Sequence, residues 1–107
     1  MSAERFRLLP GAARDITEIW EFIAEDNPSA AERLREEILE AIRRLVAFPQ
    51  QGHGRPDLSA RGLRFWSVGQ YLIAYAPNEE PLLVVAVVDG RRSPREIARM
   101  LRGRTSP

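Results

Sequence analysis

The spacing of apolar residues changes near the middle of this chain, and that change restricts the possible folds more than any other feature. Between residues 12 and 47 apolar side chains recur every three or four positions, the period of an amphipathic helix. After Pro49 the apolar residues recur at period two, as they do in strands. This order predicts an α+β domain in which helices pack on an antiparallel sheet.

The first half is predicted to form a short strand and two helices. Residues 4–9 alternate polar and apolar side chains, and Pro10-Gly11 ends that strand. A helix of about residues 12–26 follows, and a second helix covers 28–47, with Asn27-Pro28 as its N-cap and first residue. The link between the helices is short enough to require an antiparallel helical hairpin. The apolar stripe of the first helix contains Ile16, Ile19, Trp20 and Ile23.

The second half is predicted to form a meander of three strands. Residues 62–68 and 71–76 are joined at Gly69-Gln70, a turn that places glycine first. Leu82 to Val88 is continuously apolar and rich in β-branched residues, which indicates a central strand covered on both faces.

A short third helix is predicted to close the chain. Ser93 and Glu96 form a capping-box pattern with Pro94 between them, and the helix continues to about residue 102. The tail 103–107 is expected to fray.

Length and composition indicate a single domain of residues 1–107 with no metal or cofactor. The sequence has 107 residues and no cysteine, so disulfides and thiolate metal sites are excluded. The first residues lack the apolar run of a signal peptide, and the longest apolar stretch is too short to span a bilayer. A cytoplasmic location is therefore expected.

Charge is distributed unevenly along the chain. Residues 1–49 contain seven arginines and ten acids, a net charge of −3, and residues 50–107 contain nine arginines and five acids, a net charge of +4. All sixteen basic residues are arginine, which excludes any mechanism that needs a lysine. This asymmetry of charge suits an acidic partner near the C-terminal half. It is too weak to predict DNA binding from charge alone, and sequence-specific nucleic-acid binding by the isolated chain is not expected.

Several segments, taken in their order along the chain, resemble the RelE/ParE superfamily of toxin–antitoxin proteins, and the ParE branch in particular. The resemblance covers about residues 6–101, and the chain departs from it at Asp89, where histidine is common. The segments that carry it are Ala13-Arg14-Asp15-Ile16-Thr17-Glu18-Ile19-Trp20, Asn27-Pro28-Ser29-Ala30-Ala31, Leu45-Val46-Ala47-Phe48-Pro49-Gln50-Gln51-Gly52, Leu63-Arg64, Tyr71-Leu72-Ile73-Ala74-Tyr75 and Val87-Val88-Asp89-Gly90-Arg91-Arg92.

The resemblance implies one of two activities. RelE-like members cleave messenger RNA on the ribosome, which needs an acid, a base and cations around the phosphate. ParE-like members poison DNA gyrase by direct binding. His53 is the only histidine and lies between two glycines, Tyr71 and Tyr75 share a strand face predicted to point into the core, and no tyrosine or histidine follows Arg92. We therefore predict a gyrase-binding toxin with no catalytic residue; a RelE-type ribonuclease and a non-toxic member of the fold remain as alternatives.

The resemblance also implies two binding surfaces. The first would contact the target through arginines that can grip a phosphate or an acidic partner, although Arg91 and Arg92 could also simply solvate a strand end. The second would be an apolar groove for the C-terminal segment of a ParD-like antitoxin. Of the residues proposed for this groove, Trp20 could instead lie in the core, and Trp66 could lie on either face of the sheet. The predicted target-binding residues are Arg64, Arg91, Arg92 and Arg95. The predicted antitoxin-binding residues are Trp20, Ile23, Leu34, Trp66 and Leu72.

Overall fold

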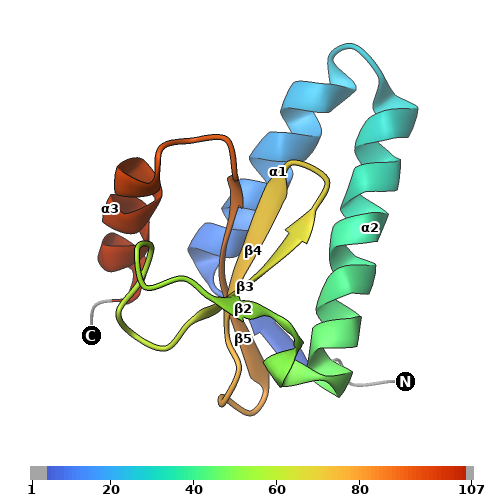
Figure 1. The fold of residues 1–107 in the computed structure, drawn as a ribbon. Coiled ribbons are helices and arrows are strands. Elements are labelled where there is room, and N and C mark those ends of the chain that lie inside the picture. Colours follow the sequence, from blue (N-terminus) through green and yellow to red (C-terminus); the bar gives the residue numbers. More distant parts are fainter. Residues whose placement is uncertain (1–4, 106–107) are drawn as a thin grey trace.

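The computed structural model describes residues 5–105, which form a mixed five-stranded sheet with helices on both faces (Figure 1). The strand order in the sheet is β1-β5-β4-β3-β2. The strands are β1 (Phe6–Leu8), β2 (His53–Gly54), β3 (Arg64–Val68), β4 (Tyr71–Ala76) and β5 (Leu82–Asp89).

The predicted helical hairpin is confirmed and consists of α1 (Pro10–Ala24) and α2 (Pro28–Ala47). The Asn27 side chain accepts a hydrogen bond from the Ala30 amide at 3.0 Å, which caps α2 as predicted. The predicted start of α1 was wrong, because Pro10 opens this helix rather than only ending the strand before it. Proline fits the first turn of a helix, where its missing N–H has no partner to lose. Within residues 5–105, no helix is long and apolar enough to cross a membrane.

Strand β5 is an interior strand of the sheet, between β1 and β4, and is covered on both faces as its continuous apolar sequence predicted. It pairs antiparallel with β4 and parallel with β1. The sheet is therefore mixed, whereas a wholly antiparallel sheet was predicted. The helices α1 and α2 and the strands β2 to β4 lie between β1 and β5 in the chain, and this connection is long enough to allow a parallel pair. A bulge between Ala74 and Tyr75 shifts the register with β5 and places Val84 opposite Tyr75.

Two apolar clusters form the core, one on each face of the sheet. The first joins α1 and α2 to one face and includes Ile16, Ile42 and Tyr75. The second covers the other face with α3 (Pro94–Thr105) and the loop before β3, through Ile97 and Leu58. Figure 1 shows α3 on the side of the sheet away from the hairpin. The sheet is therefore buried on both faces although the chain is short.

Several boundaries differ from those predicted. The loop after α2 contains a short 3-10 helix, η1 (Pro49–Gln51), and strand β2, and β3 starts two residues later than expected. The capping box of α3 is confirmed, because the Ser93 hydroxyl accepts a hydrogen bond from the Glu96 amide at 3.2 Å. The helix continues through Thr105, beyond the predicted end at residue 102, and 106–107 lie outside the described residues.

Candidate target-binding site

Arg91 and Arg92 line an open hollow of about 420 Å³ between α1, the end of the β4–β5 pair and α3. Both arginines follow β5 directly, so the central strand fixes where they leave the sheet. Apolar and polar side chains alternate around the hollow. Its other lining residues are Asp15, Glu18, Ile19, Phe22, Gln70, Tyr71, Val87, Val88, Asp89, Met100 and Arg104.

Asp89 holds Arg91 in a two-pronged ion pair at the rim of this hollow. The Arg91 Nη2 and Nε atoms donate to the two carboxylate oxygens of Asp89 at 2.9 and 3.1 Å, and the Arg91 amide donates at 2.9 Å. Gln70 donates a further bond to Asp89 at 3.1 Å. These bonds, led by the side-chain bond from Arg91, lower the pKa of Asp89 to about 2. Asp89 therefore neutralises Arg91, the first arginine of the Arg91-Arg92 pair.

A second ion pair closes the inner side of the hollow and joins α1 to α3. The Arg104 Nη2 atom donates to Asp15 Oδ1 at 2.8 Å, and the Asp15 Oδ2 atom also accepts the Val87 amide at 2.9 Å. Arg104 donates as well to the Val85 carbonyl at 3.3 Å. The pKa of Arg104 is raised, chiefly by its hydrogen bond to Asp15. This pair is largely buried and therefore serves to position α3 rather than to bind a ligand.

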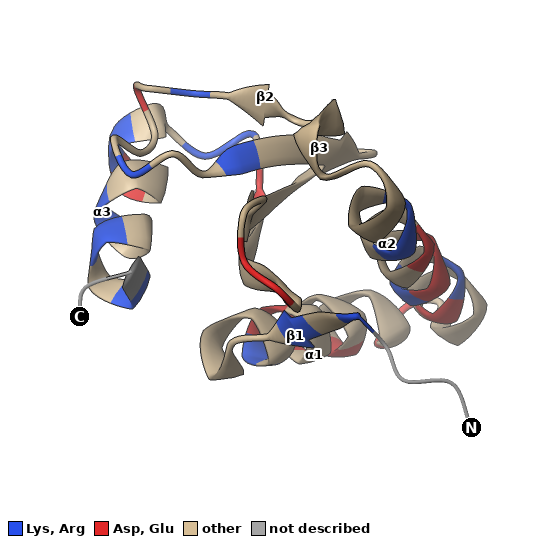
Figure 2. Cartoon of the chain, turned by 90° about the horizontal axis from the view of Figure 1, so that it is seen from below, with Lys and Arg blue, Asp and Glu red and all other residues tan. Residues whose placement is uncertain are grey.

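Three exposed arginines remain without a side-chain partner in this region of the described chain. They are Arg92, which follows β5, and Arg95 and Arg99 on α3. Residues four apart on a helix lie on the same face, so Arg95 and Arg99 project together. In Figure 2 the charged residues of α3 are mostly basic, whereas α2 carries acidic residues beside basic ones. We call Arg92, Arg95 and Arg99 the arginine face.

Arg64 does not join the other predicted target-binding residues. It pairs with Tyr75 across β3 and β4, while Asp89 pairs with Tyr71 across β4 and β5, at the other end of β4. Four residues of strand separate the two ends, which is about 13 Å. The half-buried Arg64 donates to the Gly52 carbonyl at 2.6 Å, so it ties β3 to the loop before β2.

Tyr75 is fully buried beside Arg64, and both hydrogen-bonding functions of its hydroxyl are used. The hydroxyl donates to the Pro49 carbonyl at 2.6 Å and accepts the Gly52 amide at 2.9 Å. Burial raises the pKa of Tyr75, while the Gly52 bond and the Arg64 charge oppose that shift. The predicted core position of this tyrosine is confirmed. Its hydroxyl anchors the loop that follows α2.

The remaining proton-transfer candidates lie apart from each other. His53 is exposed on β2 and stacks on Trp66, with ring centroids 6.5 Å apart. Tyr71 is half-buried and lines the hollow with Arg91 and Arg92. One tyrosine therefore lies at the Arg91 end and the other beside Arg64, and the hollow that contains Arg91 and Arg92 does not include Arg64.

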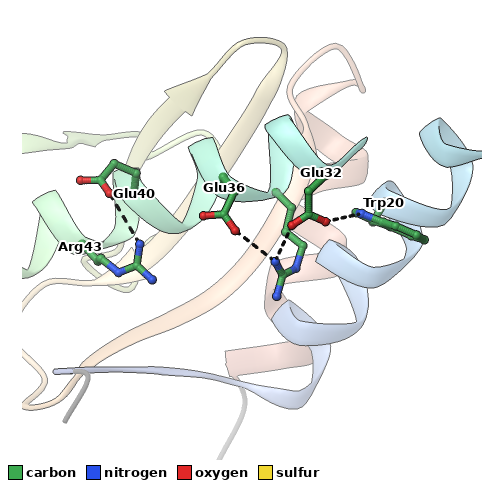
Figure 3. A network of polar contacts seen from close by, with 6 residues as sticks. Trp20, Glu32, Glu36, Glu40 and Arg43 are labelled. Atoms are coloured by element: carbon green, nitrogen blue, oxygen red, sulfur yellow. Dashed lines mark hydrogen bonds and ion pairs between the residues drawn. The ribbon is translucent and has the colours of Figure 1, made fainter. Parts of the chain in front are cut away.

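The predicted antitoxin-binding residues are all half-buried but do not share one surface. Leu34 and Trp66 pack on the cluster beneath the helical hairpin, whereas Leu72 packs on the opposite sheet face under α3. Trp20 lies at the outer side of the hairpin, where its indole N–H donates to Glu32 at 3.2 Å, and it is not enclosed in the core (Figure 3). Ile23 follows it one turn later on α1.

The network around Trp20 continues along the exposed side of α2. Arg35 contacts both Glu32 and Glu36, and Arg43 pairs with Glu40 further along (Figure 3). Exposed pairs of this kind contribute only about 0–1 kcal/mol each. They therefore solvate α2 and orient Trp20 without determining the fold.

Sequence reasoning missed two exposed aromatic residues. Phe22 is 74% exposed on α1 and lines the hollow with Arg91 and Arg92, and Phe48 is 67% exposed at the end of α2. Phe22 precedes Ile23 of the apolar stripe by one position, a rotation of about 100° about the helix axis. That offset was the signal in the sequence, because an aromatic residue off the buried stripe of a helix is expected to be exposed.

Comparisons with known proteins identify the family. The family model described as ParE toxin of type II toxin–antitoxin system, parDE, matches residues 6–94. Toxin ParE3 of Caulobacter vibrioides is 31% identical over 78 residues, which span 72% of this chain and 77% of that protein. A structure titled chromosomal ParDE TA system from P. aeruginosa has the same fold, with a TM-score of 0.66 at 18% identity over 79% of this chain and 94% of that one. The chain therefore belongs to the ParE toxin family of type II toxin–antitoxin systems.

Proposed function

We propose that this toxin inhibits DNA gyrase by direct binding, without catalysis, and that a ParD-like antitoxin neutralises it. The observation that carries the proposal is the hollow beside Arg91, which combines the exposed Phe22 with the unpaired Arg92. An aromatic anchor next to a free guanidinium group is typical of a protein-binding hot spot. The match to the ParE family supports gyrase as the target.

The groups that could move a proton support binding over catalysis. Tyr75 is buried with its hydroxyl fully bonded, and His53 is exposed at a different edge of the sheet. Asp15 and Asp89 in the hollow are each held by an arginine. A ribonuclease of this architecture would have to use Tyr71, with Glu18 as the one lining carboxylate outside those two pairs.

The antitoxin contact is proposed on the outer side of the helical hairpin. Trp20 and Ile23 are half-buried there, and Trp20 borders a shallow hollow of about 280 Å³ with Glu32 and Arg35. A disordered segment that folds onto such a surface stabilises the toxin by mass action. Leu72 lies on the other sheet face, so a segment that touched all five predicted residues would have to pass around the edge of the sheet.

A gyrase supercoiling assay with the purified chain tests the target. We expect loss of supercoiling and accumulation of cleaved plasmid, and we expect the R91Q/R92Q variant to lose this effect. The R33Q/R44Q variant is the matched control, because it removes two exposed arginines from α2. An unaffected gyrase together with cleaved transcripts on ribosomes would contradict the proposal in favour of the ribonuclease.

Binding of the antitoxin is tested separately with the product of a neighbouring antitoxin gene. Alanine at Trp20 or Ile23 is expected to weaken binding by more than about 1 kcal/mol in calorimetry. Unchanged affinity for alanine variants of all five predicted residues would reject this surface. That outcome would leave the gyrase proposal intact.

A further inference from the structure

The end of the chain is strongly basic compared with the rest of it. Residues 91–107 contain six arginines and one glutamate, a net charge of +5, whereas residues 1–90 contain ten arginines and fourteen acids, a net charge of −4. The single glutamate, Glu96, is occupied by the capping box with Ser93. The positive charge is thus concentrated on α3 and the turn before it (Figure 2).

The arginine face is fixed in place from beneath. Ile97 and Leu101 are 2% and 1% exposed against the sheet, and the Arg104–Asp15 pair holds the last turn. Arg95 and Arg99 therefore project from a helix whose orientation is set by the core. Side chains carried by a rigid element bind a ligand with less loss of conformational entropy than side chains on a mobile loop.

The exposed positions of this region suit a polyanion better than a protein surface. Between residues 91 and 103 the exposed side chains include no leucine, isoleucine, valine, methionine or aromatic residue. Protein interfaces need a buried apolar centre, which this face lacks. Duplex DNA needs none, because phosphate contacts supply most of non-specific binding.

The spacing of the arginines matches a continuous line of phosphates. Arg95 and Arg99 are about 6 Å apart along the helix axis. Each strand of duplex DNA carries one negative charge per about 3.4 Å of its axis, so two guanidinium groups about 6 Å apart can both lie near phosphates of one strand. A row of carboxylates on a protein surface would contact both arginines only if its side chains had the same spacing as Arg95 and Arg99.

From these observations we propose that the arginine face binds the phosphate backbone of duplex DNA without sequence preference. The inference rests on the proposed function and deepens it: Phe22 at the hollow contacts the gyrase protein, Arg92 lies where the hollow meets the arginine face, and Arg95 and Arg99 contact the DNA that gyrase holds. The toxin would then recognise the enzyme–DNA complex better than the enzyme alone. The charge asymmetry between the two parts of the chain would orient the toxin as it approaches.

Fluorescence anisotropy of the full chain with a short labelled duplex tests this inference without gyrase. We expect affinity to fall steeply between about 50 and 200 mM salt. The R95Q/R99Q variant should bind roughly tenfold more weakly at the lowest salt and lower the slope of log K against log salt by about 1.8, since each lost phosphate contact accounts for about 0.9. The R95K/R99K variant should retain binding, because phosphate attraction depends mainly on charge.

The R33Q/R44Q variant controls for the loss of two charges elsewhere and should keep the slope of the unmodified chain. Circular dichroism melting checks that each variant is folded. Absence of DNA binding at low salt, or equal losses in R95Q/R99Q and R33Q/R44Q, would overturn the inference. So would arginine-dependent binding of an acidic peptide in place of the duplex.

The gyrase assay separates this inference from the proposed function. Gyrase inhibition that survives R95Q/R99Q, together with no DNA binding, would reject the inference and keep the proposed function. DNA binding that depends on Arg95 and Arg99, without any effect on gyrase, would reject the proposed function and keep the inference.

Discussion

Asp15 on the first helix and Arg104 on the last lie 2.8 Å apart, Oδ1 to Nη2, and this pair connects the two ends of the fold. The Asp15 side chain is 12% exposed and the Arg104 side chain 21%. The same carboxylate accepts the Val87 amide from the central strand. The pair therefore joins α1, β5 and α3 at one point beside the proposed target-binding hollow.

Replacing Asp15 with asparagine should destabilise the protein by about 2 kcal/mol, because it leaves a largely buried guanidinium group without its counter-charge. Urea unfolding measures the change. Glu21→Gln on the exposed side of the same helix is the control and should change the free energy of unfolding by less than about 0.5 kcal/mol. Similar values for the two variants would show that the pair does not hold α3 in place.

Two neighbouring glycines should respond very differently to alanine. A Cβ atom at Gly52 would lie 2.5 Å from the Tyr75 hydroxyl and 2.9 Å from the Phe65 carbonyl, whereas one at Gly54 would meet nothing within 4 Å. Gly52→Ala must therefore displace the buried tyrosine or the strand, at a cost of about 2 kcal/mol or more. Gly54→Ala should be close to neutral. Thermal unfolding of both variants checks the prediction, and equal melting temperatures would contradict it.

The pair formed by Asp89 and Arg91 should be visible in an acid titration. The pKa of Asp89 is lowered from 3.8 to about 2, so the stabilising interaction is fully present above pH 3.8 and is lost as pH falls toward 2. Carbon-detected NMR of the Asp89 carboxyl should show a midpoint near 2. In R91Q the midpoint should rise toward the ordinary value, because the largest cause of the shift has been removed. A midpoint that did not move in R91Q would mean that Gln70 or the backbone amide dominates.

Periodicity was enough to predict the helical hairpin, the meander and the central position of β5. It could not predict that β1 joins the sheet in parallel, because a three-residue strand carries no signal of its direction. Periodicity also could not show that Arg64 holds the loop before β2 rather than projecting to a target. Its hydrogen bond to the Gly52 carbonyl depends on a loop conformation that no local pattern encodes.

For a similar reason, some of the predicted site residues lie together in the fold and others lie apart. Arg91, Arg92 and Arg95 are neighbours in sequence, so a local motif is enough to place them near one another, and their role in target binding stays a prediction. Leu34 lies on α2 and Leu72 on β4, and the alternation of side chains along β4 places Leu72 on the sheet face away from the hairpin. Phe22 was not predicted, because the helical period of α1 identifies only its buried stripe, although the place of Phe22 off that stripe is readable from the sequence.

The choice between a binding toxin and a ribonuclease can be tested at Tyr71. Within the described residues its hydroxyl makes no hydrogen bond, and its ring packs on the cluster beneath the hairpin. Tyr71→Phe should therefore change stability by less than about 0.5 kcal/mol, so any loss of activity would report on the hydroxyl itself. We expect growth arrest on expression to persist in Tyr71→Phe and in His53→Ala, with an SOS reporter induced in both.

The R91Q/R92Q variant provides the contrast, since it leaves both of these side chains in place but removes the guanidinium groups at the hollow. It should relieve growth arrest while the protein stays folded. If Tyr71→Phe instead relieved the arrest, and the unmodified chain blocked translation without inducing the SOS reporter, the hydroxyl would be acting as a proton donor or acceptor. The hollow beside Arg91 would then be the active site of a nuclease, with Glu18 as the next residue to replace.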